Sequence, residues 1–265
     1  MVRVSDLMEA INSMVSEPCI KGLEEELKNG LVYGDSDARV TGIVVAWKAT
    51  SRVLRYAKEK GANTIVFHED VFYRWDHHPI VVNPRSSEFS HVNLRIASLM
   101  DGLNLFRYHT TWDDAPGGNN DSLVEALGLK LEKRLPCSRL ASPPEPMSLH
   151  EFVGSVKRVL GVSRVIVAGA PVSRVERVMV VAGGGAKSLS ILDSAVAHGA
   201  NVLLSADTIA DTAFYAMEAG LAIVDPGHHP MEEYGMEVFA RKLREKLGSS
   251  VDVYFYRHEP AIRIL

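Results

Sequence analysis

Short runs of β-branched and aliphatic residues alternate along this chain with longer amphipathic stretches. The runs that predict buried strands are 41–47, 63–67, 164–169, 177–183, 201–206 and 221–225. Residues 51–60, between the first two runs, carry apolar positions at helical spacing and are followed by Gly61, which is typical of a helix end. Strand–helix alternation is typical of α/β proteins. The pattern therefore predicts an α/β fold with mixed, largely parallel sheets.

The first 15 residues predict an amphipathic helix rather than a secretory leader. Apolar side chains recur at Val4, Leu7, Ile11 and Val15, with polar residues between them. No run along the chain approaches the roughly 18 apolar residues that a membrane span needs. The sequence thus predicts a protein without a membrane segment, and we expect it in the cytoplasm.

The one break in composition lies at residues 136–147, which contain four prolines. Proline at this density cannot continue a helix or a central strand, so the segment is interpreted as a linker. Directly after it, Ser148 and Glu151 have the spacing of a capping box, in which each side chain accepts a hydrogen bond from a backbone N–H at a helix start. We therefore predict a first α/β domain at 1–135 and a second at 148–265.

The two halves of the chain resemble each other when the sequence is shifted by 138 positions. The shift places Gly61-Ala62-Asn63 on Gly199-Ala200-Asn201 and Ala57 on Ala195. Strands of α/β proteins look alike, so chance similarity is the alternative explanation. A repeat predicts two related half-domains with the same strand order, and a first half that carries an insert at about 72–92.

Charge and cysteine content narrow the range of functions. The 265 residues include 29 Lys and Arg against 33 Asp and Glu, which gives a net charge of −4. A dedicated nucleic-acid binder usually presents a basic face, so this balance argues against a nucleic-acid partner. Cys19 and Cys137 lie in no metal-binding or redox spacing, and we expect two inert thiols in a reducing cytoplasm. A small-molecule substrate is the partner we expect.

Three polar clusters directly follow predicted strands. They are His68, Glu69 and Asp70; His109, Asp113 and Asp114; and His228, His229, Glu232 and Glu233. Ligands of open α/β sheets collect at the carboxyl ends of strands. A neutral imidazole and a carboxylate four residues apart can bind one ion from a single turn, a combination that suits Zn, Mn or Fe. Such spacing is weak evidence among 10 histidines and 33 acidic residues, but three clusters at strand ends favour a metal site over solvated surface.

Two further motifs are weaker signals. Gly183-Gly184-Gly185-Ala186-Lys187-Ser188 follows a strand as a phosphate loop would, but Ala186 stands where a Walker loop needs glycine, and the Rossmann spacing also fails. An anion on the following helix and a tight strand-to-helix turn are the two alternatives. Asp76-His77-His78-Pro79 lies in the insert, where adjacent histidines point in opposite directions. We interpret it as a surface loop, with His77 and His78 as second-choice ligands.

The order of these motifs resembles the Nif-three-like family, whose members are widely named GTP cyclohydrolase one type-two homologues. The resemblance covers about residues 30 to 247. The segments that match the family's ordered motifs are Gly61-Ala62-Asn63, His68-Glu69-Asp70, HTTWD at 109–113, GGNND at 117–121, Gly183-Gly184-Gly185, Ser205-Ala206-Asp207 and GHHPME at 227–232. The ordered set is more specific than any single motif.

The resemblance implies a subunit of two α/β domains, a toroidal homohexamer and a pair of divalent metal ions held by residues from both halves. By motif, the metal ligands would be His68, Glu69, Asp113, His228 and Glu232. Glu69 and Asp70 stand where the family has His and Pro, and Asp211 stands where a further His is expected. A carboxylate at position 69 shifts the preference toward hard ions such as Mn, Fe or Mg. One ion instead of two therefore stays open.

Two functions are compatible with these residues. The first is a metal-dependent hydrolase acting on a nucleotide, a phosphoester or a purine-like small molecule. Two ions about 3.5–4 Å apart would activate a bound water, with Glu232 as the bridging ligand and His109 as an outer group that carries or orients a proton. The second is a non-catalytic metal-binding regulator or chaperone, which the altered residue Glu69 favours.

Overall fold

The computed structural model describes residues 2–20, 29–73 and 90–262, in which the chain is organised as two units. Unit 1 takes residues 1–14, 23–109 and 239–258, and unit 2 takes residues 15–22, 110–238 and 259–265. Each unit is assembled from separate segments, whereas the sequence predicted one division near residue 136. The difference arises because the C-terminal segment returns to the first sheet, which no local pattern signals. The His77-His78 motif and most of the predicted insert lie outside the described residues.

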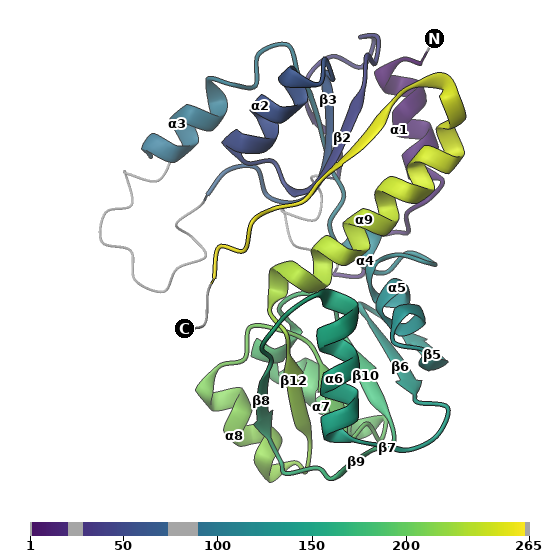
Figure 1. Ribbon diagram of the computed structural model, residues 1–265, viewed down its shortest axis with the longest axis vertical. Helices are drawn as coiled ribbons and strands as arrows, with labels where there is room; N and C mark the ends of the chain where they lie inside the picture. The colour runs from purple at the N-terminus through teal and green to yellow at the C-terminus, as the bar shows by residue number, and fades with distance from the viewer. Residues whose placement is uncertain (1, 21–28, 74–89, 263–265) are drawn as a thin grey trace. The chain divides into compact units, whose positions relative to one another are not determined.

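Unit 1 is built on a five-stranded sheet with the order β1-β4-β3-β2-β13 (Figure 1). Its strands are β1 (Gly30–Tyr33), β2 (Ile43–Lys48), β3 (Thr64–Glu69), β4 (Asn104–Arg107) and β13 (Val253–Tyr256), and its helices include α1 (Val4–Asn12), α2 (Ser51–Glu59) and α3 (His91–Ala97). All neighbouring strands are parallel except β1, which runs antiparallel to β4. Alternate strand residues such as Ile65 and Phe67 pack with α2 and α3 in one apolar core.

Unit 2 is built on a six-stranded sheet with the order β5-β6-β10-β11-β12-β8. Its strands are β5 (Lys130–Leu135), β6 (Ser138–Ser142), β8 (Ile166–Gly169), β10 (Val178–Val180), β11 (Val202–Leu204) and β12 (Ala222–Asp225), with β7 (Met147–Ser148) and β9 (Arg174–Val175) paired separately. Its helices include α4 (Thr110–Asp113), α5 (Asn119–Ala126), α6 (Leu149–Leu160), α7 (Leu189–Ala197) and α8 (Ala210–Glu218), and α9 (His228–Leu247) belongs to unit 2 up to Val238.

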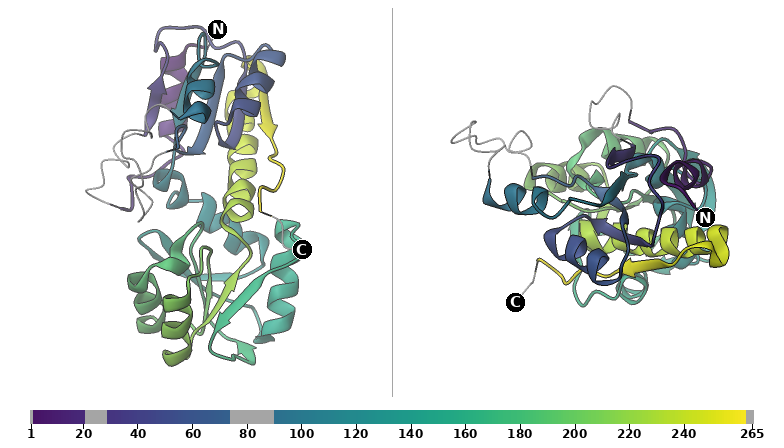
Figure 2. Two further views of the ribbon diagram at one scale, coloured as in Figure 1. Left: turned by 90° about the vertical axis from the view of Figure 1, so that its left-hand side faces the viewer. Right: turned by 90° about the horizontal axis from the view of Figure 1, so that it is seen from above.

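Helices cover both faces of the unit 2 sheet (Figure 2). Val202 and Leu204 pack in the core that contains side chains of α5 and α6, whereas Leu203 between them packs with α7 and α8. Because successive strand residues are buried in cores on the two faces of the sheet, the strands of unit 2 are nearly continuous apolar runs. Among the helices of the described residues, none is both long and apolar enough to cross a membrane.

The strand order of the two sheets supports the predicted repeat. The series β1-β4-β3-β2 in unit 1 corresponds to β8-β12-β11-β10 in unit 2, and the first strand of each series is antiparallel to its neighbour. Gly61 and Gly199 follow equivalent helices with φ angles of 68° and 72°. Asn63 and Asn201 each accept a hydrogen bond from a backbone N–H just before the first parallel strand of their unit. The two series are extended differently, by β13 in unit 1 and by β6 and β5 in unit 2.

The predicted linker at 136–147 is wrong, because residues 138–142 form strand β6 of the unit 2 sheet. Strand β6 lies between β5 and β10 and pairs antiparallel with both. The prolines flank β6 instead of interrupting it, so the hydrogen bonds of the ladder are intact. Helix α6 begins with the predicted capping box, in which Ser148 Oγ accepts from the Glu151 N–H and Glu151 Oε2 accepts from the Ser148 N–H.

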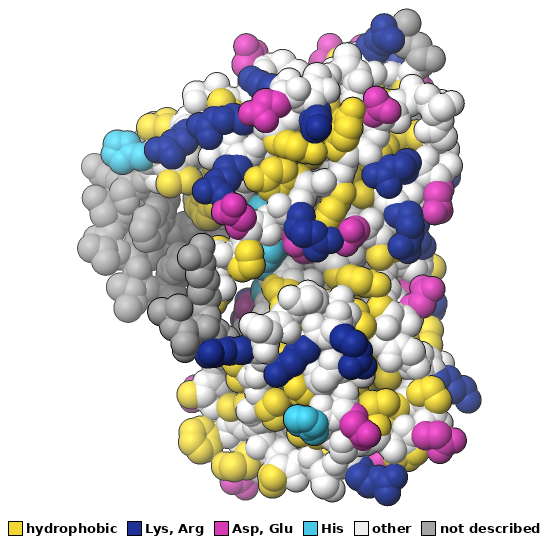
Figure 3. All heavy atoms as spheres, in the orientation of Figure 1, with side chains coloured by type: hydrophobic (Ala, Val, Ile, Leu, Met, Phe, Trp, Pro, Cys, Tyr) yellow, Lys and Arg dark blue, Asp and Glu magenta, His cyan; other side chains and the backbone are white. Residues whose placement is uncertain are grey.

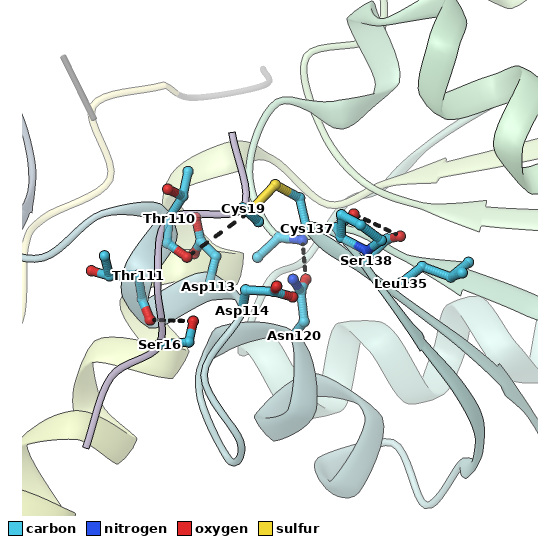
Figure 4. Close-up of a disulfide and its surroundings, with 12 residues drawn as sticks. Ser16, Cys19, Thr110, Thr111, Asp113, Asp114, Asn120, Leu135, Cys137 and Ser138 are labelled. Atoms are coloured by element: carbon cyan, nitrogen blue, oxygen red, sulfur yellow. Dashed lines mark hydrogen bonds between the residues drawn. A yellow bond between two sulfur atoms is a disulfide. The ribbon is translucent and has the colours of Figure 1, made fainter. Parts of the chain in front are cut away.

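Cys19 and Cys137 form a disulfide bond in unit 2, so the expectation of two inert thiols is wrong (Figure 4). The two residues are 118 positions apart in the sequence, and only the fold brings their Cα atoms to 5.4 Å. Cys137 occupies the turn between β5 and β6 with a φ angle of 54°. Besides the disulfide, two hydrogen bonds anchor the segment that carries Cys19: the N–H and the Oγ of Ser16 both donate to the Thr111 carbonyl.

Candidate metal centre

In unit 1, two imidazoles and a carboxylate gather at the carboxyl end of the parallel strands. His68 and Glu69 are the last two residues of β3, and His109 lies two residues after β4. The ring centroids of His68 and His109 are 4.8 Å apart, and His109 Nε2 lies 4.0 Å from Glu69 Oε1. The three predicted site residues of unit 1 are therefore neighbours, and each offers a donor atom that divalent metals accept.

One hydrogen bond fixes the orientation of His68. Its side chain is fully buried, and its Nδ1 lies 3.0 Å from the carbonyl oxygen of Tyr108. Because a carbonyl oxygen can only accept, Nδ1 carries the proton of the neutral ring and Nε2 keeps its lone pair. A ring held in this way presents Nε2 to a metal ion, which is the usual arrangement of metal-binding histidines.

Two cations lie at the same end of the unit 1 sheet. Arg107 is buried, and its Nε lies 3.1 Å from Asp70 Oδ1, while Lys48 Nζ donates to the Asp70 carbonyl oxygen. Burial lowers the pKa of the Lys48 ammonium, and the charges of Glu69 and Asp70 only partly oppose this effect. Because the Asp70 carboxylate pairs with Arg107, Glu69 is favoured over Asp70 as the metal-binding carboxylate of this strand end.

In unit 2, the first turn of α9 brings an imidazole and a carboxylate together. His228 begins α9 shortly after β12, and Glu232 lies four residues later on the same face of the helix. His228 Nε2 and Glu232 Oε1 are 3.0 Å apart, and the Glu232 side chain is 2% exposed. Metal–ligand distances of about 2.0–2.2 Å allow two atoms at this separation to bind one ion. The pair therefore fits a divalent metal.

The glycine turn after β10 encloses this pair. Gly183 has a φ angle of +72°, and a Cβ there would lie 2.2 Å from Glu232 Oε1 and 3.0 Å from His228 Nε2. At the next residue, Gly184, a Cβ would lie 2.5 Å from Asp207 Oδ2. The turn is rich in glycine because its backbone approaches three side chains of unit 2. Of the two alternatives for this motif, the structure therefore favours the tight turn over an anion site.

A second carboxylate, Asp207, contacts the other side of the His228 ring. Asp207 Oδ2 lies 3.0 Å from His228 Nδ1 and 3.0 Å from Lys187 Nζ. The hydrogen bond with His228, supported by Lys187 and opposed by burial, lowers the pKa of Asp207 to about 2. Asp207 is therefore ionised at neutral pH, and the His228 ring lies between two carboxylates.

Asp113 is the remaining predicted ligand and is buried at the end of α4. Asn119 Nδ2 donates to Asp113 Oδ1 at 2.5 Å. The Asn119 side chain also lies directly against α9, because a Cβ at Gly235 would come within 1.7 Å of its Oδ1. Its neighbour Asn120 accepts a hydrogen bond from the Ala182 N–H, just before the glycine turn. The two asparagines thus connect Asp113 with α9 and with the end of β10.

A buried arginine holds the segment that follows Asp113. Arg139, in β6, is 1% exposed and lies 2.6 Å from Asp114 Oδ1 and 2.5 Å from Asp121 Oδ1. It also donates to the main-chain oxygen of Asp114 at 2.7 Å. Arg134 binds the same Asp121 from the surface, with a side chain that is 48% exposed. These ion pairs fix both ends of the loop between α4 and α5.

The structure thus sorts the predicted site residues into two sets. His68, Glu69 and His109 are neighbours in unit 1, His228 and Glu232 are neighbours in unit 2, and Asp113 is joined to α9 through Asn119. Sequence reasoning gave no site role to the residues that orient these side chains. Asn119, Lys187 and Asp207 stood in quoted motifs, whereas Tyr108 and Arg139 did not. The position of Asp207 after a predicted strand was a usable signal, whereas nothing in the sequence distinguished Arg139.

Comparison with known proteins extends over both units. A family model described as Duf34/NIF3 (NGG1p interacting factor 3) matches residues 2–261. The chain is 27% identical over 263 residues to a GTP cyclohydrolase 1 type 2 homolog of Clostridium perfringens, with 95% of each chain covered. It is 28% identical over 235 residues to the protein of that name in Pseudomonas aeruginosa, with 85% of this chain and 87% of the relative covered. Its fold is similar to that of a Bacillus cereus protein related to NIF3, with a TM-score of 0.80, 19% identity and coverage of 100% and 99%.

Proposed function

Because this chain belongs to the Duf34/NIF3 family, we propose that it binds divalent metal ions. The proposed ligands are His68, Glu69, Asp113, His228 and Glu232. The observation that carries the proposal is the pair of donor atoms on His228 and Glu232, 3.0 Å apart, against which Gly183 leaves no space for a side chain. We propose that these ligands bind two ions of Zn, Mn or Fe, or a single ion given Glu69 in place of a family histidine.

We further propose that the centre hydrolyses a small molecule. Divalent ions, when bound, would lower the pKa of a water and bind the attacked and departing oxygens. Glu232 is the proposed bridging ligand, since its carboxylate is buried and lies beside His228. His109 is partly exposed and lies 4.0 Å from Glu69, which suits a residue that carries or orients a proton. The substrate classes are a nucleotide, a phosphoester or a purine-like ring, and the names of the relatives support a GTP cyclohydrolase-type reaction.

A non-catalytic role as a metal-binding regulator or chaperone is the second candidate. Glu69 favours it, because the family pattern has a histidine at this position. Glu69 also lies opposite Lys48 in the register of β2 and β3, so its charge serves a neighbouring cation as well as a metal. A centre weakened at one ligand would bind metal without efficient turnover.

Turnover of the metal-loaded protein distinguishes the two functions. The parent, Glu232→Gln and Glu233→Gln would be assayed against GTP, other nucleotides and simple phosphoesters, before and after treatment with a chelator. The hydrolase proposal predicts turnover that is lost on chelation and in Glu232→Gln but is retained in Glu233→Gln. Stoichiometric metal without turnover of any substrate in the panel would contradict the hydrolase and support the regulator.

We propose a homo-oligomer in the cytoplasm, a hexamer by family resemblance, with a small-molecule substrate and no nucleic-acid partner. Apolar side chains gather over α8 (Figure 3), where Ile209, Phe214 and Met217 are 48%, 66% and 45% exposed. Exposed apolar surface of this kind favours burial against another subunit. The disulfide limits this proposal to a cytoplasm that preserves disulfides, as in hyperthermophiles, because disulfides otherwise persist in oxidising compartments.

A further inference from the structure

The turn that follows β11 carries a carboxylate that the proposed metal ligands do not include. We propose that this carboxylate, Asp207, is a positioning residue for the metal ligand His228. It holds the proton of the imidazole on Nδ1, so that Nε2 presents its lone pair beside Glu232. Lys187 holds Asp207 from its other side. The inference rests on the proposed metal binding by His228 and Glu232.

His228 lies between two carboxylates, so the ring nitrogen that carries the proton decides whether Nε2 can bind a metal. Its Nδ1 is 3.0 Å from Asp207 Oδ2, and its Nε2 is 3.0 Å from Glu232 Oε1. A neutral ring has one N–H, and an ionised carboxylate can only accept a hydrogen bond. A proton on Nε2 would place the Nδ1 lone pair against the Asp207 oxygen and would block the atom that must bind metal. A proton on Nδ1 satisfies Asp207 and leaves Nε2 available to a metal.

The backbone holds both ends of this hydrogen bond. Asp207 has a φ angle of +63°, in the left-handed region that aspartate tolerates better than most residues. The Ala206 N–H before it donates to the Gly183 carbonyl at 2.8 Å. Thr208 after it donates through its N–H and its hydroxyl to Asp225 Oδ2, at 3.0 and 2.8 Å.

Asp225 then connects this turn with the start of α9. While its Oδ2 accepts from Thr208, its Oδ1 accepts from the Gly227 N–H at 2.9 Å, directly before His228. Thr208, next to the acceptor Asp207, and Gly227, next to the donor His228, therefore hydrogen-bond to the two oxygens of the same carboxylate. An arrangement with so many fixed partners holds a metal ligand in one orientation before the ion arrives.

Lys187 gives the glycine-rich motif a role other than phosphate binding. Its Nζ lies 3.0 Å from the same Asp207 oxygen that accepts from His228. A Cβ at Gly184 would lie 2.5 Å from that oxygen and 2.8 Å from the lysine nitrogen, so the backbone packs directly against the pair. The lysine side chain is 56% exposed, and water therefore weakens its contribution relative to that of Asp207.

Zinc affinity of four proteins tests the positioning role. Asp207→Ala removes the acceptor, and Asp207→Asn keeps an acceptor oxygen and the shape but removes the charge. Asp101→Asn, at an exposed turn residue before β4, is the matched control. By competition with a chromophoric chelator, we expect zinc to dissociate about 10–100-fold more readily from Asp207→Ala than from the parent. Asp207→Asn should lie between them, and Asp101→Asn should equal the parent; equal affinities in all four proteins would overturn the inference.

A second measurement needs no metal. Long-range proton–nitrogen spectra of the metal-free protein, assigned by the loss of signal in His228→Gln, report which ring nitrogen carries a proton. In the parent, we expect a proton on Nδ1. In Asp207→Ala, we expect that this proton no longer lies in a defined hydrogen bond. A parent ring protonated only on Nε2 would refute the positioning role, whether or not the protein binds zinc. Failure of the metal proposal itself would instead appear as unchanged zinc affinity in Glu232→Gln.

Discussion

Replacement of Arg139 by methionine should destabilise unit 2 strongly. The guanidinium is 1% exposed and lies 2.6 Å from Asp114 and 2.5 Å from Asp121. Methionine fills much of the space but leaves two carboxylates without their buried cation. Removal of one partner from a buried ion pair costs about 3–5 kcal/mol, because the remaining charge is desolvated and unpaired. Arg134→Met removes a cation from the same Asp121, but this arginine is 48% exposed, so we expect a loss of about 0–1 kcal/mol.

Hydrogen exchange followed by mass spectrometry measures this difference within unit 2, where peptides from β6 and α5 report the free energy of opening. Arg139→Met should exchange much faster in both peptides, and Arg134→Met should resemble the parent. A second change, Asp114→Asn, should recover part of the loss in Arg139→Met because it removes the carboxylate whose ion pair Arg139 supplied. Equal and small effects of the two arginine substitutions would refute the view that Arg139 holds the loop after Asp113.

Three further outcomes follow from the same structure. Cys19→Ala/Cys137→Ala opens a cross-link between residues 118 positions apart, which should lower stability by about 4–5 kcal/mol on the chain-entropy relation; an unchanged urea midpoint would argue against a structural disulfide. Burial tends to raise the pKa of Asp121, but hydrogen bonds from Arg134, Gly117 and Arg139 lower it overall from 3.8. The ionised Asp121 therefore stabilises the fold fully above pH 3.8, and this stabilisation is lost as the pH falls through the lowered pKa of Asp121. The melting temperature of Asp121→Asn should accordingly depend less on pH in this range than that of the parent. Phe214→Glu should weaken self-association in light scattering, and a monomeric parent at micromolar concentration would exclude the proposed oligomer.

Local patterns predicted the elements and the ends of the strands well. The strand at 63–67 is β3, and the helix at 51–60 is α2, because burial and helical periodicity are properties of neighbouring residues. The capping box at Ser148 and Glu151 formed as expected, since both partners lie within one turn. For the same reason, His68 and His228 were correctly assigned to strand ends, although their roles as ligands stay predictions.

Features that depend on distant residues were not predictable from these patterns. Cys19 and Cys137 meet only because residues 15–22 join unit 2, and β13 joins the sheet of unit 1 from the far end of the sequence. The prolines around β6 indicated a linker because proline marks the end of a strand as readily as the end of a domain. Arg139 looked like an ordinary surface cation, since its two acidic partners lie 25 and 18 residues before it.

The metal content of Glu232→Gln and Glu233→Gln tests the central claim most directly. The two glutamates are adjacent and buried, at 2% and 6% exposure, and each contacts the histidine four residues before it, at 3.0 and 3.1 Å. Of these two pairs, the pair of Glu232 and His228 is the one that lies against the Gly183 backbone. By plasma-emission analysis of protein purified without chelator, Glu232→Gln should lose its metal while Glu233→Gln keeps the parent's content. Equal metal in all three proteins would contradict the proposed centre and would point to His77 and His78 as the next candidates.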